Sequence, residues 1–259
     1  MVLDLQTIGY PAVREAFNDV LQLCVERLGK SELKLAEEVL GLAEFAGISA
    51  NVSEMLADTA LYSRKPSSSG SRTAGRRAID RIAPRLPLKR DPLGVHIAAR
   101  LPAARFSVLL VERVHEGGGV LARDLLEDGA TVHVMDRALA AQVAALGGFQ
   151  IAGRFVDLEP WYIGFGIVVP LRKSEAVAIR LGIVDEADIT QARVALHELV
   201  YPAHLHDLDL VMLALEPAIT ALAHAIDTGD LGIDDLATGL GALLPGKPTS
   251  KRKRKASAR

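Results

Sequence analysis

A run of short, strand-like segments between Phe106 and Leu171 constrains the fold of this chain more than any other feature. Asp128-Gly129 lies inside this run and is the strongest hairpin signal in the chain, because such a tight turn requires positive φ. An alanine-rich stretch at 137–146 predicts a short helix between the third and fourth segments. The five candidate strands are residues 106–114, 120–126, 131–135, 149–156 and 161–169.

Short strands joined by tight turns are typical of an antiparallel meander that curls on itself. We therefore expect a central five-stranded antiparallel β-module over residues 105–171, with the form of a small barrel. Half of a β-sandwich is the alternative, because the number of strands does not distinguish the two architectures.

The regions on both sides of this module predict helices, so the expected fold class is α+β. In residues 1–62, apolar side chains recur at helical spacing in three stretches with short connections between them. Residues 63–104 have the composition of a basic, proline- and serine-rich linker with one short helix. Residues 172–244 predict a second helical region. Residues 245–259 form a basic tail that we expect to be disordered, because it has almost no apolar content.

Five stretches of the chain share a sequence pattern with other proteins. They are Leu56 to Tyr62, Arg77 to Arg81, Arg105 to Ser107, Gly118 to Leu126, and Met135-Asp136. Together they resemble uncharacterised bacterial proteins that have a helical N-terminal part and a central β-rich module. The resemblance covers about Leu56 to Leu171. It implies a bacterial cytosolic protein, and it implies no activity and no catalytic residues.

The cysteine content and the apolar stretches bear on the compartment. Cys24 is the only cysteine, so no disulfide can form within the chain, which fits a reducing environment. It falls on the apolar face of a predicted helix, where we expect a buried small side chain. The first ten residues lack the pattern of a signal peptide, and no apolar stretch approaches the length of a membrane span. We expect a cytoplasmic protein without membrane contact.

The net charge of −2 conceals a strong partition along the chain. Residues 61–105 carry a net charge of +9 and residues 247–259 carry +7, whereas the β-module from 106 to 171 carries −4. Two basic segments of this kind can neutralise phosphates. The candidate phosphate-binding residues are Arg76, Arg77, Arg81, Lys89 and Arg90 in the first segment, and Lys251, Arg252, Lys253, Arg254 and Lys255 in the tail. The alternative is that these segments pair with the acidic helical regions of the same chain.

The β-module contains four side chains that could form a surface site. His115 and His133 can meet across neighbouring strands, and Trp161-Tyr162 is an aromatic pair suited to stacking on bases or anchoring a partner. The alternatives are a solvated sheet face for the histidines and core packing for the aromatic residues.

A second group of histidines supplies the residue types of a metal site: His197, His204 and His206. Their spacing matches no zinc pattern, and Pro202 interrupts the helix that would align them. We therefore expect no resident metal and no cofactor.

No motif has the residue spacing of an enzyme site. The leading hypothesis is therefore a non-enzymatic, nucleic-acid-associated accessory protein that uses its two basic segments, an arm within residues 61–105 and the tail from 247 to 259. The first alternative is a module for protein–protein interaction or scaffolding, with another protein or a second copy of itself as partner. A metal-dependent enzyme is the remote alternative.

Overall fold

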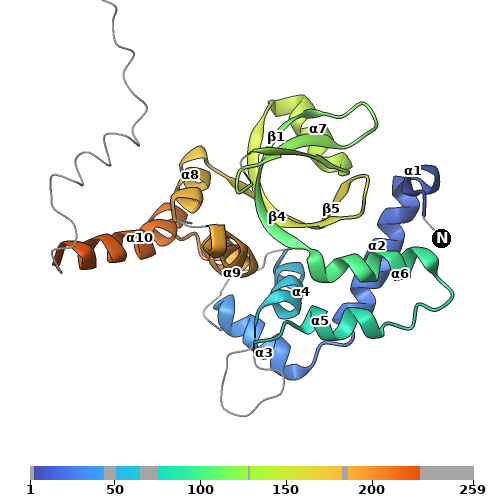
Figure 1. Cartoon of the computed structure of the whole chain (residues 1–259), viewed down its shortest axis with the longest axis horizontal. Coiled ribbons are helices and arrows are strands. Elements are labelled where there is room, and N and C mark those ends of the chain that lie inside the picture. The colour runs from blue at the N-terminus through green and yellow to red at the C-terminus, as the bar shows by residue number, and fades with distance from the viewer. Residues whose placement is uncertain (1–2, 44–50, 65–74, 128, 183–185, 228–259) are drawn as a thin grey trace, which may run out of the picture. The chain divides into compact units, whose positions relative to one another are not determined.

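The computed structural model describes residues 3–43, 51–64, 75–127, 129–182 and 186–227. Residues 1–215 form one compact unit, and a second unit begins at Glu216. The fold is mixed α+β, as predicted, with a five-stranded sheet set between helices (Figure 1). The strands are β1 (Arg105–Val114), β2 (Val120–Asp124), β3 (Ala130–Val134), β4 (Phe149–Asp157) and β5 (Tyr162–Leu171).

Helices precede, interrupt and follow the sheet. Before it lie α1 (Leu5–Ile8), α2 (Tyr10–Val25), α3 (Lys30–Val39), α4 (Val52–Tyr62), α5 (Ala78–Ile82) and α6 (Pro92–Arg100). Between β3 and β4 lies α7 (Arg137–Leu146), with the bounds that the sequence predicted. After the sheet come α8 (Lys173–Gly182), α9 (Glu186–Leu205) and α10 (Leu210–Asp227). The end of the predicted helical region, residues 228–244, and the tail over 245–259 lie outside the described residues.

The five strands close in the order β1-β2-β3-β5-β4. Four neighbouring pairs are antiparallel, but β3 and β5 run parallel and meet at a single residue pair, Val134 and Tyr162. The prediction of a wholly antiparallel module was therefore wrong at this seam. The cause is topological: each strand runs opposite to the one before it in sequence, so the third and fifth strands share a direction when closure brings them together.

The interior of the barrel is apolar through most of its length. Alternate residues of β1, such as Leu109 and Val111, point inward, and α7 adds Leu139 and Val143 to the same cluster. The outward residues of β1 and β4, such as Phe106 and Ala152, pack instead against helices that include α9. A third cluster joins α2, α5 and α6 to the β4–β5 connection. Cys24 is buried in this third cluster, as expected, and burial raises the pKa of its thiol to about 11.

A buried ion pair fastens two helices to the outside of the barrel. Arg154 of β4 is 1% exposed and donates from Nε to Asp58 Oδ1 of α4 at 2.6 Å. Its guanidinium carbon lies 3.9 Å from the centroid of the Tyr62 ring, and the Tyr201 hydroxyl of α9 donates to Asp58 Oδ2 at 2.9 Å. One carboxylate therefore connects β4, α4 and α9.

The described part of the segment predicted as a linker contains two helices, where the sequence predicted one short helix. Within residues 63–104, both α5 and α6 contribute buried side chains, among them Ile79 and Ile97. Pro92 begins α6, where its missing N–H is not needed, and the Asp91 side chain caps the helix by accepting from Gly94 N at 2.9 Å. Pro92 therefore starts a helix in a stretch whose proline content predicted little regular structure.

Pro202 also departs from expectation. The sequence predicted a helix end before it, but α9 continues through Pro202 to Leu205. Val200, Tyr201 and Ala203 are all buried in the cluster outside the barrel. This burial favours continuation of the helix past a residue that lacks a backbone donor.

None of the described helices has the length and apolar character that crossing a bilayer would require.

Candidate functional site at the barrel surface

The outward face of β2 and β3 differs from the rest of the barrel exterior. Outward residues of β4 and of the first half of β1, such as Ala152 and Phe106, are buried under helices, as described above. On β2 and β3, by contrast, Leu121 and His133 are half-buried, while Arg123 and Thr131 are exposed. This face is therefore accessible to a ligand.

His115, His133 and Trp161 come together at one edge of this face. The rings of His115 and His133 stack with their centroids 3.8 Å apart and an interplanar angle of 31°. The Trp161 ring lies edge-to-face with His133 at a centroid distance of 6.5 Å. Both histidines are partly exposed, whereas Trp161 is only 5% exposed. The three residues come from the β1–β2 loop, β3 and the β4–β5 loop, so barrel closure assembles the cluster.

Backbone hydrogen bonds hold both histidine rings in place. His133 Nε2 donates to the carbonyl oxygen of Gly118 at 2.7 Å, and His115 Nδ1 accepts from Gly117 N–H at 3.0 Å. Partial burial lowers the pKa of His133. The hydrogen bond to Gly118 O opposes this shift, and the nearby His115 ring adds to it. Lowering this pKa favours a neutral imidazole, which suits a stacking surface more than an acid catalyst.

Tyr162 does not join this cluster, although it follows Trp161 directly. It packs against the inner barrel cluster, and its hydroxyl accepts from Arg105 Nη2 at 2.7 Å. Of the four residues predicted to share a surface, His115 and His133 lie on it and Trp161 is buried beside them. Tyr162 points inward, because neighbouring residues at the start of a strand project to opposite sides.

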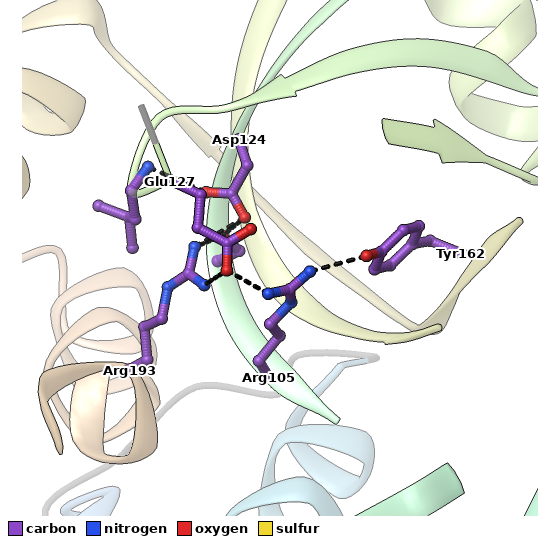
Figure 2. Close-up of polar contacts among 7 residues, drawn as sticks. Arg105, Asp124, Glu127, Tyr162 and Arg193 are labelled. Carbon is purple, nitrogen blue, oxygen red and sulfur yellow. Dashed lines mark hydrogen bonds and ion pairs between the residues drawn. The ribbon is translucent and has the colours of Figure 1, made fainter. Parts of the chain in front are cut away.

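Tyr162 belongs to a polar network that the sequence interpretation missed, drawn in Figure 2. Arg105 and Arg193 both donate to Oε1 of Glu127, which Arg193 Nη1 reaches at 2.6 Å. Arg193 Nη2 also contacts Asp124 Oδ2 at 2.7 Å. These residues come from β1, β2, the β2–β3 turn, β5 and α9. They are up to 88 positions apart in sequence (Arg105 to Arg193), so no local motif reveals the network.

The residues of the basic arm differ in their surroundings. Arg76, Lys89 and Arg90 are exposed. Arg77 instead forms a two-point contact with Asp80 at 2.6 and 3.0 Å and donates to Pro102 O, while Arg81 contacts Glu32 at 3.3 Å. The tail residues Lys251 to Lys255 lie outside the described part of the chain.

The three candidate metal ligands do not converge. His197 is fully buried and shares a hydrogen bond with Ser63 Oγ at 3.0 Å. His206 Nε2 donates to Leu40 O at 2.8 Å, and His204 is an exposed residue that lines a cavity of about 250 Å³ with Asp207. Within the described ranges, no three histidine, cysteine or acidic residues are grouped as metal ligands would be.

The chain matches no protein-family model, no curated protein and no solved structure. Fold geometry and side-chain chemistry therefore carry the functional argument by themselves.

Proposed function

We propose that this protein binds single-stranded nucleic acid without sequence specificity, as an accessory protein that performs no chemistry of its own. The observation that carries the proposal is the stacked pair of His115 and His133, which lies beside Trp161 on an accessible barrel face. Flat rings on such a face stack with any base, and that kind of contact is tolerant of sequence.

The connectivity of the barrel supports the same function by analogy. Five strands in the order β1-β2-β3-β5-β4, with a helix between β3 and β4, have the connectivity of oligonucleotide-binding barrels. Those barrels bind ligands with strands 2 and 3 and with the loops after strands 1 and 4. His115, His133 and Trp161 occupy the matching places here. This is a likeness of connectivity alone, and the side chains must supply the specific evidence.

Phosphate contacts are assigned in this proposal to the basic segments. Two groups of basic residues are suited to neutralise the phosphates of the nucleic acid. They are the exposed Arg76, Lys89 and Arg90, and the five consecutive basic residues from Lys251 to Lys255. Arg77 and Arg81 already have partners within the protein, so we expect them to contribute less. We place this activity in the cytoplasm.

The test is fluorescence anisotropy with a labelled single-stranded oligonucleotide. If about five phosphates are contacted, affinity should fall about 100-fold between roughly 50 and 200 mM salt. Removing the tail after Pro245 should weaken binding at every salt concentration. Replacing both His115 and His133 by alanine should weaken it about tenfold through lost stacking. His204→Ala, an exposed histidine on α9, is the matched control and should leave binding unchanged.

Affinity that responds to neither salt nor tail removal would contradict the electrostatic part of the proposal. Affinity that survives loss of both histidines would contradict the assignment of the barrel face.

A second candidate function is interaction with another protein or with a second copy of this chain. Val177 and Leu181 of α8 are 48% and 47% exposed, and Met212 of α10 is 58% exposed. Exposed apolar side chains at helical spacing favour a helical partner. Sedimentation of the full chain tests this candidate: a stable dimer or complex that Val177→Ser disrupts supports it, and a monomer that retains no partner contradicts it.

A further inference from the structure

Two arginine side chains share one carboxylate oxygen at the end of the barrel opposite α7. Arg105 Nη1 and Arg193 Nη1 both donate to Glu127 Oε1 (Figure 2). The side chain of Glu127 is 35% exposed and that of Arg105 is 31% exposed, so solvent reaches this contact. A carboxylate held by two convergent guanidinium groups occupies the position that an oxyanion ligand would take.

Each arginine is also held by a partner other than Glu127. Arg193 Nη2 donates to Asp124 Oδ2 at 2.7 Å and to Ser107 Oγ at 3.0 Å. Arg105 Nη2 donates to the Tyr162 hydroxyl at 2.7 Å. These anchors are independent of Glu127, so each arginine has a fixed partner without it.

The charge at this end of the barrel also fits an incoming anion. With Glu127 in place, the two arginines are balanced by Asp124 and Glu127. When Glu127 leaves, one positive charge remains uncompensated beside donors that are already oriented. The Tyr162 hydroxyl, which accepts from Arg105, retains its own proton for donation to a ligand oxygen. A tetrahedral phosphate, with several acceptor oxygens, matches this set better than a second carboxylate.

We propose that Arg105, Arg193 and Tyr162 form a binding site for a phosphate group, and that the Glu127 carboxylate is its built-in competitor. The site is distinct from the histidine cluster, and it does not depend on the proposed binding of single-stranded nucleic acid. A free phosphate ion and the phosphate of a nucleotide share the chemistry that this site recognises.

The test is calorimetric titration of the full-length protein with inorganic phosphate at constant ionic strength. Glu127→Gln removes the competing charge, and we expect this variant to bind phosphate about tenfold more tightly than the unaltered protein. Adding Arg105→Gln to that variant should abolish the gain. Glu112→Gln is the matched control, because Glu112 pairs with the exposed Arg123 at 2.5 Å elsewhere on the barrel.

A nucleoside 5′-monophosphate and its parent nucleoside distinguish the sources of the phosphate. Tighter binding of the monophosphate than of inorganic phosphate indicates a nucleotide ligand, and equal binding indicates the free ion. Thermal unfolding of the unaltered protein gives a second readout that needs no Glu127 variant: phosphate should raise its midpoint, and Arg105→Gln should remove that rise. A folded Glu127→Gln variant that binds phosphate no better than Glu112→Gln overturns the proposal, as does an unaltered protein whose midpoint does not respond.

Discussion

Arg154 is a fully buried cation on the outside of the barrel. Its charge is compensated by Asp58, and the Tyr62 ring lies against its guanidinium group. A buried pair of this kind adds little net stability compared with apolar residues, but removing one partner leaves the other charge unpaired and buried. The pair therefore fixes how α4 and α9 sit on β4 more than it adds to the free energy of unfolding.

Replacing Asp58 by asparagine should lower the free energy of unfolding by about 3–5 kcal/mol, because Arg154 would stay buried without a counter-charge. Urea denaturation followed by circular dichroism measures this change. Glu112→Gln, which removes an exposed partner of Arg123, should cost less than about 1 kcal/mol. Equal effects of the two substitutions would show that the Arg154 pair is not desolvated.

A second residue gives the stability a specific dependence on pH. Burial, and secondarily the charge of Arg154, holds the pKa of His197 well below its usual value. The unfolded chain takes up a proton at this residue near pH 6.5, whereas the folded chain does not. The stabilising contribution is therefore complete above about pH 6.5 and is lost as the pH falls toward the folded pKa.

The free energy of unfolding should therefore decrease with falling pH more steeply in the unaltered protein than in His197→Gln. One proton corresponds to a difference in slope of at most about 1.4 kcal/mol per pH unit. Denaturant titrations between about pH 4.5 and 7.5 provide the measurement, with the region around pH 6.5 as the onset. Parallel curves for the two proteins would mean that His197 accepts a proton in the folded state.

At the scale of elements, local sequence patterns predicted most strands and the helix between them. Apolar alternation and glycine turns act over a few residues, so the bounds of β1, β4 and α7 follow closely from the sequence. The parallel seam between β3 and β5 could not be predicted in this way, because it depends on closure of the whole barrel.

The same limit applied to the candidate sites. The pairing of His115 with His133 was predicted as one that neighbouring strands could bring about, and the structure places the two rings together. The contacts of Arg193 with Asp124 and Glu127 join α9 to the β2–β3 end of the barrel, and they depend on a tertiary packing that no spacing in the sequence encodes.

The β1–β2 hairpin is the element on which the histidine cluster depends. Gly119 has a φ of +69°, and a Cβ atom at this position would lie 2.2 Å from Val134 O. Gly119→Ala should therefore displace the hairpin from β3 and separate His115 from His133. The affinity for single-stranded oligonucleotide should fall as a result. The histidine ring resonances and oligonucleotide binding report the two effects. Gly147→Ala is the control for positive φ, because a Cβ there has no neighbour within 4 Å. If Gly119→Ala and Gly147→Ala lose the same oligonucleotide affinity, backbone strain alone explains the loss and the contact with Val134 does not.

At the scale of the whole molecule, the proposed function divides the work between two kinds of surface. The β-module is acidic overall, with a net charge of −4 in residues 106–171, while positive charge is concentrated in the arm before it and in the tail. We therefore assign base stacking to the barrel face and phosphate neutralisation to the basic segments. If the tail alone bound the nucleic acid, the barrel face would take no part in binding.

Trp161 is the only tryptophan in the chain and lies beside His133, so its intrinsic fluorescence reports directly on the barrel face. Titration of the full-length protein with unlabelled single-stranded oligonucleotide should change this fluorescence to a saturating value. The midpoint should match that found by anisotropy, and the change should disappear when His115 and His133 are both replaced by alanine. Tryptophan fluorescence that stays constant while anisotropy reports binding would contradict the central claim, because the strand would then be held without the barrel face.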